Sequence, residues 1–225
     1  MKTLIKDFDS LDRHYRANLV NSIIGIKQAS LIGTFDNCNL SNLALFSSAV
    51  HLGSDPPLVA IFSRPQIDSP KQTLSNIIEN KFYTINHVNT SIIQRAHSCS
   101  FKFSPDESEF VECRLTEESI SSFKAPFVAE SNASIGVRYK RHFTIKENGV
   151  VMVVGEMKAL FVQNNIIQEN GEINFNRSNS VGVAGNNTYY KLSQIASLKY
   201  FNSDQKDQLK QNIDKEFHQN ISETK

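Results

Sequence analysis

Alternation of apolar and polar residues is clearest in SIGVRYKRHFTI, at residues 134–145. Successive side chains of a β-strand point to opposite faces, so this pattern predicts a half-buried strand. The face predicted to pack on the core carries Ile135, Val137, Tyr139, Phe143 and Ile145. The opposite face is polar and carries Arg138, Lys140, His142 and Thr144.

Further strands are predicted from apolar, β-branched runs bounded by turn residues. These runs are ASLIGTF (29–35), NLALFSSAVHL (42–52), LVAIFS (58–63), FYTINHV (82–88) and GVVMVVGEMKALFV (149–162). The second and third run are expected to form a hairpin turning at GSDPP, because consecutive prolines cannot continue a ladder. Gly155 and Glu156 interrupt the last run, which predicts a bent strand. Many strands and few helices indicate a barrel or a sandwich.

The period changes in DSPKQTLSNIIENKF, where a helix is predicted. Ser69 is the expected N-cap and Pro70 the first helical residue. One helical face is expected to carry Leu74, Ile77, Ile78 and Phe82. A short helix is predicted at SIIQRAHS (91–98), and a C-terminal one at 201–225 with an apolar stripe of Leu209, Ile213, Phe217 and Ile221.

The segment from Phe101 to Pro126 is polar and lacks a regular period. Such a segment is typical of a lid or a surface insertion. No internal repeat or low-complexity linker divides the chain, and its length of 225 residues suits one large domain.

The charge balance of the chain argues against two classes of binding partner. A formal net charge of +1, with charges interspersed, offers no basic face for nucleic acid or anionic membranes. No eighteen-residue apolar run is present, and the charged N-terminus lacks the pattern of a signal peptide. Cys38, Cys99 and Cys113 form no CxxC pair and are expected to be reduced thiols in a cytoplasmic protein. No cluster has metal-ligand spacing, so no metal site is expected.

Two candidate ligand contacts stand out, and each has a plainer explanation. The helix start at Ser69, with Lys71 and Thr73 in its first turn, is either a solvated cap or an anion site suited to a phosphate monoester. Asn42, Ser47 and Ser48 interrupt an apolar run. Such polar side chains are satisfied either by the backbone or by a ligand.

Several motifs, in this order, resemble those of the flavin reductase-like family of FMN-binding split barrels. They are SNLALFSS, DPPLVAIFSR, DSPKQTLSNI, KFYTIN, VVGEM and VGVAGNNTYY, and they span about Asn21 to Tyr190. The resemblance implies a mainly β fold, a Greek-key antiparallel barrel with flanking helices. It also implies an N-terminal extension at 1–20, an FMN-binding domain at 21–200 and a C-terminal helix at 201–225.

The resemblance also implies roles for individual residues. Asn42, Leu43 and Ala44 would face the pyrimidine edge of FMN, and Ser47 and Ser48 would lie under the ring or the ribityl chain. Arg64, Lys71 and Thr73 would hold the phosphate, and Tyr189 would close the site. Val183 stands where the family usually has an arginine.

The function expected from the resemblance is an NAD(P)H-dependent flavin reductase, with NADH or NADPH passing hydride to flavin N5. The alternative is an FMN-binding carrier, redox sensor or electron-transfer protein without turnover. His142 is the candidate catalytic residue, because histidine titrates near neutral pH; its plainer interpretation is an exposed surface residue. Arg138 and Lys140 beside it are expected to meet the dinucleotide phosphates. A homodimer that completes the flavin site is also expected.

Overall fold

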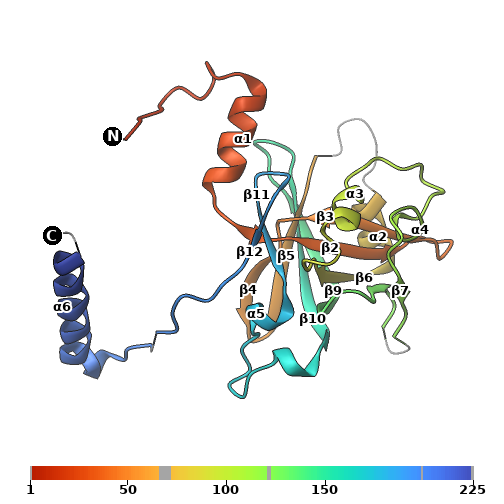
Figure 1. Ribbon diagram of the computed structural model, residues 1–225. Coiled ribbons are helices and arrows are strands. Elements are labelled where there is room, and N and C mark those ends of the chain that lie inside the picture. Colours follow the sequence, from red (N-terminus) through yellow and green to blue (C-terminus); the bar gives the residue numbers. More distant parts are fainter. Residues whose placement is uncertain (1, 66–71, 121–122, 199, 224–225) are drawn as a thin grey trace. The chain divides into compact units, whose positions relative to one another are not determined.

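The structure is a computed structural model that describes residues 2–65, 72–120, 123–198 and 200–223, with the side chains of 216–223 left out. The chain divides into two compact units, Met1–Ser193 and Gln194–Lys225. The first unit holds all the described strands and five α-helices (Figure 1). Its helices are α1 (Arg13–Ile23), α2 (Gln72–Asn80), α3 (Ile93–Ser98), α4 (Glu109–Glu112) and α5 (Phe175–Ser178), with a 3₁₀ turn at Asn164–Ile166.

Seven strands form one antiparallel sheet in the order β3-β2-β6-β9-β10-β5-β4. Their bounds are β2 (Ser30–Phe35), β3 (Ser41–Phe46), β4 (Val50–Ser54), β5 (Pro57–Ser63), β6 (Phe82–His87), β9 (Ala133–Thr144) and β10 (Val151–Val162). The two edge strands, β3 and β4, are consecutive in the chain and are joined by residues 47–49 only. The sheet therefore curls until its edges come near each other, yet β3 and β4 do not pair. This is a split barrel, and the predicted mainly β fold with flanking helices is confirmed.

The predicted hairpin before the double proline is confirmed in part. β4 and β5 pair from Val50↔Ala60 to Ser54↔Pro57 around a cis Asp55–Pro56 bond. The prediction of one continuous strand over 42–52 is wrong, because the chain leaves β3 at Phe46 and begins β4 at Val50. The intervening serines make the crossing from one edge of the sheet to the other.

The bend predicted in β10 is present, since its register with β9 shifts between Val154 and Gly155. A Cβ on Gly155 would lie 2.3 Å from Val137 Cγ1 and 2.5 Å from Tyr83 Oη, so only glycine fits there. On β9 the shift lies at Lys140, which has no partner between Tyr139 and Arg141. A bulge breaks the alternation. The expectation that Phe143 packs in the core is therefore wrong; its side chain is 48 % exposed.

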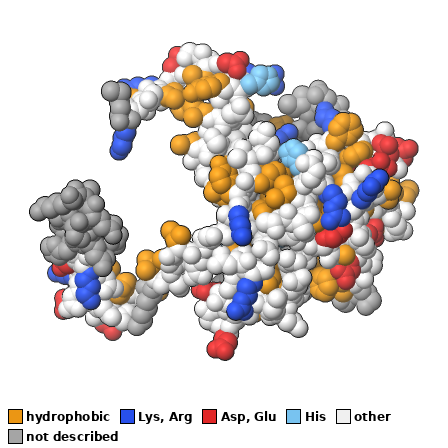
Figure 2. Space-filling view, in the orientation of Figure 1, with side chains coloured by type: hydrophobic (Ala, Val, Ile, Leu, Met, Phe, Trp, Pro, Cys, Tyr) orange, Lys and Arg blue, Asp and Glu red, His pale blue; other side chains and the backbone are white. Residues whose placement is uncertain are grey.

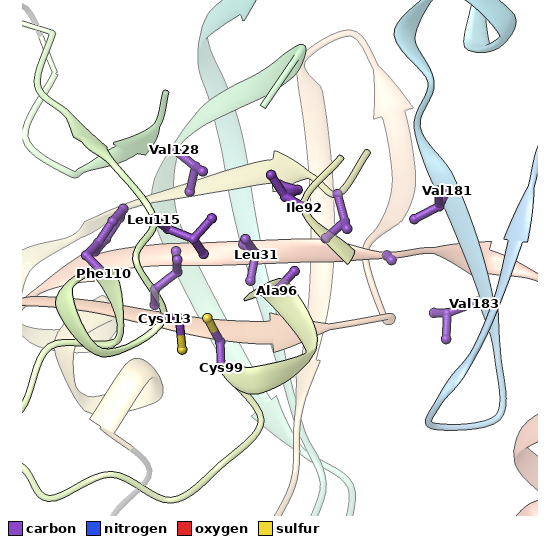
Figure 3. Close-up of a cluster of buried hydrophobic side chains, with 13 residues drawn as sticks. Leu31, Ile92, Ala96, Cys99, Phe110, Cys113, Leu115, Val128, Val181 and Val183 are labelled. Atoms are coloured by element: carbon purple, nitrogen blue, oxygen red, sulfur yellow. The ribbon is translucent and has the colours of Figure 1, made fainter. Parts of the chain in front are cut away.

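Buried apolar side chains form two clusters on opposite faces of β2. Ile32 joins the barrel interior, together with side chains of β5, β6, β9, β10 and α2. Leu31 joins the second cluster, which α3, α4 and neighbouring loops cover (Figure 3). Phe110, Cys113 and Leu115 belong to this second cluster. The segment 101–126, expected to be a lid or surface insertion, is thus partly a core element.

The burial pattern of helix α2 agrees with the predicted helical period, since Leu74 and Ile77 are buried on the side that faces the barrel. Phe82 was expected on the apolar face of this helix, but this prediction is wrong, because Phe82 begins β6. The helix ends at Asn80 because Lys81 adopts a positive φ of 66°. The predicted N-cap, Ser69, and Pro70 lie outside the described residues.

A second sheet has the order β1-β11-β12, with β1 (Lys27–Gln28), β11 (Val181–Ala184) and β12 (Thr188–Lys191). β11 and β12 form a hairpin that turns at Gly185, whose φ is +64°. In a two-stranded pair, β7 (Glu117–Glu118) of the partly buried segment is joined to β8 (Phe127–Val128), which directly follows that segment. VGVAGNNTYY is therefore a hairpin whose first strand buries Val181 and Val183 in the second cluster.

The second unit consists of a linker, a 3₁₀ turn (Ser203–Gln205) and helix α6 (Lys206–Glu223). The predicted C-terminal helix is confirmed. Within this unit Leu209 and Ile213 are exposed, and the side chains of Phe217 and Ile221 lie outside the described residues. In the first unit, α1 follows the N-cap Asp12 and was not predicted. Among the described residues, no helix is long and apolar enough to span a membrane.

Candidate functional site

A cavity of about 950 Å³ lies at the split between β3 and β4. Its walls come from β3 and the link 47–49, the end of β5, the start of α2, and the segment after α3. Asn21, Lys27 and Asn186 add side chains from the N-terminal part and from the β11–β12 turn. Ligand pockets of proteins typically measure about 300–1,000 Å³, so the cavity is large enough for a nucleotide-sized molecule.

Asn42 fastens β3 to α2 at the floor of this cavity. Its Nδ2 donates to Thr34 Oγ1 at 3.2 Å and to Thr73 Oγ1 at 3.1 Å. Asn76 Nδ2 donates to the same Thr34 hydroxyl at 3.0 Å, and all four residues are buried. The protein itself therefore satisfies the Asn42 amide nitrogen. Contact of Asn42 with a flavin stays a prediction, although the residue does line the cavity.

The two serines of the link have different surroundings. Ser48 Oγ donates to Phe62 O and accepts from Phe62 N, both at 3.1 Å, so its side chain replaces a ladder partner of β5. Ser47 lines the cavity and is half-buried. Backbone bonding thus accounts for the Ser48 hydroxyl, but Ser48 also lines the cavity, so its contact with a flavin stays a prediction, as does that of Ser47.

The outer edge of β3 faces α4. Leu43 N donates to Glu109 Oε2 at 2.9 Å, and the Leu43 side chain is buried in the core rather than in the cavity. Alternate residues of an antiparallel edge strand direct their backbone groups away from the neighbouring strand. The N–H and C=O of Leu45, two residues on, therefore point to the same outer side as Leu43 N. Ala44 and Leu45 both line the cavity, at the open end of this edge.

Cationic side chains lie around the cavity. Arg64, predicted to bind phosphate, lines it and is exposed. The exposed Lys102 and the half-buried Lys27, which the sequence did not single out, line it as well. Thr73 lines the cavity in the first turn of α2, and Lys71 lies outside the described residues. The structure thus brings Arg64 and Thr73 to one cavity at the start of a helix, where backbone N–H groups favour anions.

The segment FKFSP after α3 forms one wall and was missed as part of the site. Phe101 and Phe103 pack edge-to-face with ring centroids 5.0 Å apart, and Phe101 is exposed. Gln72 Nε2 donates to Pro105 O at 3.3 Å, which ties this wall to the start of α2. The aromatic–basic–aromatic pattern in an otherwise polar segment was the available signal, because exposed aromatic pairs are typical of binding surfaces.

A smaller cavity of about 360 Å³ adjoins the first and shares Leu45, Ser47 and Arg64 with it. His97, Asn186 and Asn187 give it a polar wall. Tyr189, predicted to be part of the site, lies behind this wall, and its hydroxyl is hydrogen-bonded to His97 Nδ1 at 3.0 Å. Burial raises the pKa of Tyr189, so the hydroxyl stays protonated at neutral pH. Tyr189 therefore holds His97 rather than lining either cavity.

His142 lies away from both cavities of this chain. It is exposed on β9, and its Nδ1 is hydrogen-bonded to the Tyr139 hydroxyl at 2.7 Å. Its catalytic role stays a prediction.

The neighbouring polar face of β9 is occupied by ion pairs. Glu156 bonds to Lys158, to Lys140 at 3.2 Å and to Arg138 at 3.1 Å, and these hydrogen bonds, led by that from Lys158, lower the pKa of Glu156 to about 2. Arg138 and Lys140 therefore neutralise an acidic side chain and line neither cavity.

The first unit is thus a split barrel with a cavity where its edge strands separate. The family model of the flavin reductase like domain matches residues 27–182. The chain belongs to this family, and the resemblance found in its motifs is confirmed.

Solved structures agree with this assignment. A proposed flavin reductase with a split barrel domain from Shewanella frigidimarina is 39 % identical, with a TM-score of 0.83 over 86 % of this chain and 96 % of that one. An FMN-binding protein from Thermus thermophilus is 12 % identical, with a TM-score of 0.67 over 88 % and 100 %. An NADH:FAD oxidoreductase from Streptomyces globisporus is 11 % identical, with a TM-score of 0.65 over 85 % and 100 %. The last two show a shared fold.

Proposed function

We propose that this chain binds FMN in the larger cavity and catalyses NAD(P)H-dependent reduction of flavin. The observation that carries the proposal is the position of the cavity, between the first turn of α2 and the open backbone edge of β3. One end of the cavity is suited to an anion, and the other to a planar ring with polar edges. FMN has both parts, and when bound it would supply the hydride chemistry while the protein provides position and shelter from water.

The phosphate end is formed by Thr73, Arg64 and the backbone at the start of α2. The Thr73 hydroxyl accepts from Asn42, and within the described residues it donates to no other group, so its proton is proposed to be donated to an anion. Within the described residues Arg64 has no ion pair, which leaves its guanidinium available to a phosphate. Lys71 is proposed to add a second cation.

The ring end is formed by Ala44, Leu45 and Ser47. The outward backbone groups of Leu45 offer a donor and an acceptor, which match the alternating polar atoms of a pyrimidine edge. Phe101 on the opposite wall offers an aromatic face. These groups fit the isoalloxazine ring of FMN.

The smaller polar cavity is proposed to take the nicotinamide nucleotide. It adjoins the ring end through Leu45 and Ser47, and Asn186, Asn187 and His97 offer hydrogen bonds. Hydride transfer needs the two reacting rings within a few ångströms, which adjoining cavities allow. Val183, which lines this cavity without a charge, favours the second candidate, an FMN-binding carrier or electron-transfer protein. Anaerobic addition of NADH or NADPH separates the two functions, because only a reductase bleaches the flavin absorbance.

The proposal includes a homodimer. Apolar side chains are exposed on the N-terminal part, as at Ile23 and Ile24 with exposures of 75 % and 72 %, and Figure 2 shows apolar patches at the surface of this unit. In the second unit Ile195 and Leu198 are 98 % and 89 % exposed. Exposed apolar surface of this kind marks an interaction site. Sedimentation of the FMN-loaded protein as a monomer at micromolar concentration would contradict the dimer.

Ligand affinity tests the FMN site. Replacing Arg64 by alanine should weaken FMN about ten- to a hundredfold, because a charge-assisted contact contributes roughly 1.5–3 kcal/mol. Riboflavin, which has no phosphate, should be affected much less. The control is Arg141→Ala, which removes an exposed arginine of β9 that lines neither cavity. Equal losses for both ligands would contradict the phosphate contact, and failure of the wild-type protein to bind FMN would refute the proposed function.

A further inference from the structure

Glu109 is a buried carboxyl group in the wall of the larger cavity. It begins the short helix α4, and its side chain lines the cavity although the residue is only 8 % exposed. Oε2 accepts a hydrogen bond from Leu43 N at 2.9 Å, at the outer edge of β3. The preceding residue, Ser108, is fixed by a 2.9 Å hydrogen bond to the Ser41 hydroxyl. The carboxyl is therefore held in place from two points on the same strand.

Apart from Leu43 N and the backbone of Glu109 itself, no described residue donates a hydrogen bond to this carboxyl group. Neither Lys102 nor Arg64, which line the same cavity, comes within ion-pair distance of Glu109. A buried carboxylate without a cation is costly and binds a proton more readily than in water. Glu109 thus has a single hydrogen-bond donor outside its own residue and no cation partner among the described residues, and it lines the cavity.

The surroundings of Glu109 favour its protonated form. Burial raises the pKa of Glu109, and only the hydrogen bond from Leu43 and its own backbone oppose this. The thiols of Cys99, at the end of α3, and Cys113, at the end of α4, are hydrogen-bonded to each other and buried beside it. Burial also raises the pKa of both thiols, so they remain neutral and do not stabilise a proton-free carboxylate by charge. Their sulfur atoms lie together in Figure 3.

We propose that Glu109 is the proton-holding residue of the cavity: it takes up a proton from solvent when a flavin bound there is reduced, and returns it when the flavin is reoxidised. This inference rests on the proposed function. Addition of hydride to a neutral oxidised flavin places two electrons and one proton on the ring system and leaves one net negative charge. A carboxylate in the same poorly solvated cavity is repelled by that charge, so Glu109 binds one proton from water and the local charge is balanced.

The position of Glu109 explains why it serves this role. Its bond to Leu43 is stronger for the carboxylate, but it persists in the protonated group, because a neutral carboxyl oxygen also accepts from an amide. The protonated group then donates through the other oxygen into the cavity. Glu109 would thus change its protonation state without releasing β3, and the walls of the cavity would remain in place through a redox cycle.

The test is the pH dependence of the midpoint potential of FMN-loaded protein, measured by spectroelectrochemistry with mediators and without nicotinamide. In the pH interval in which Glu109 is ionised beside oxidised flavin and protonated beside reduced flavin, the wild-type potential should fall more steeply with pH than that of Glu109→Gln, by the slope that one additional proton per two electrons gives. Glutamine keeps the bond to Leu43 but holds no exchangeable charge. Glu112→Gln, which removes an exposed carboxylate from the same short helix, should behave as wild type.

Equal slopes for wild type and Glu109→Gln overturn the inference. If the glutamine variant does not fold or bind FMN, the infrared difference spectrum of the wild-type protein decides. A protonated-carboxyl band that appears on reduction and shifts in D₂O supports the assignment, and its absence overturns it. FMN binding is checked first by absorbance. If FMN binds but neither the steeper slope nor the carboxyl band is found, the role of Glu109 is refuted and the proposed function is not. If FMN does not bind, the proposed function is refuted.

Discussion

His87 makes the stability of this protein depend on pH in a predictable direction. It ends β6, and its Nδ1 lies 3.4 Å from Ser180 Oγ, next to the β11–β12 hairpin. Its ring stacks on Phe175 with centroids 6.2 Å apart. Burial lowers the pKa of His87 from 6.5 to about 4, so the folded protein holds this imidazole neutral. The residue therefore lies where the second sheet docks against the barrel.

The size of the effect follows from the two pKa values. Above pH 6.5 the imidazole is neutral in both folded and unfolded chains, and its contribution is fully present. As the pH falls below 6.5 the unfolded chain binds the proton first, and the free energy of unfolding decreases until the folded state also binds it near pH 4. At about 1.4 kcal/mol per pKa unit, the total loss is about 3 kcal/mol, of which about 2 kcal/mol is expected by pH 5.

The assay is urea unfolding at pH 7 and pH 5 for wild type and His87→Gln. Between pH 7 and pH 5 the free energy of unfolding of the glutamine variant should decrease by about 2 kcal/mol less than that of the wild type, because the variant has no imidazole to protonate. His14→Gln is the control, since His14 is exposed on α1. The same pH dependence in wild type and His87→Gln would refute the reasoning.

Two further predictions concern packing and thiol chemistry. Gly155→Ala should destabilise the fold by about 1–3 kcal/mol in thermal or urea unfolding, since its Cβ would overlap Val137 and the Tyr83 hydroxyl. Tyr83→Phe should recover part of that loss, because it removes a hydroxyl that is buried without a partner; no recovery would contradict the clash. In native protein only the exposed Cys38 should react quickly with a thiol reagent, and the buried Cys99 and Cys113 should react after unfolding. Three fast thiols would contradict this.

The sequence predicted the strands well where turn chemistry and local period agree. The β4–β5 hairpin follows from Asp55, Pro56 and Pro57, and the bend of β10 from Gly155. The strand break at residues 47–49 was not predicted, because a side-chain hydroxyl, that of Ser48, takes the place of a backbone partner. The bulge at Lys140 was likewise not predicted, although the charged Arg141 interrupts the apolar positions of the alternation at this point.

The candidate site was predicted in part for a similar reason. Ala44, Ser47, Arg64 and Thr73 stand in motifs that are continuous in sequence, and the structure places all four at the cavity. Glu109 was missed because it meets Leu43 across 66 positions of the chain, and nothing near it in sequence indicates that contact. Contacts of this kind arise when a helix packs against a strand that is distant in sequence, here α4 against the edge of β3, and a local pattern does not indicate them.

The open edge of β3 has a consequence for handling the protein. An unpaired strand edge is a template on which another chain can add a strand, and such pairing leads to aggregation. Glu109 blocks this edge at Leu43, but no described strand pairs with the outward backbone groups of Leu45 next to it. On the proposed function, FMN would cover that remaining stretch. Protein purified and stored with excess FMN should consequently stay clear at concentrations at which the ligand-free protein precipitates.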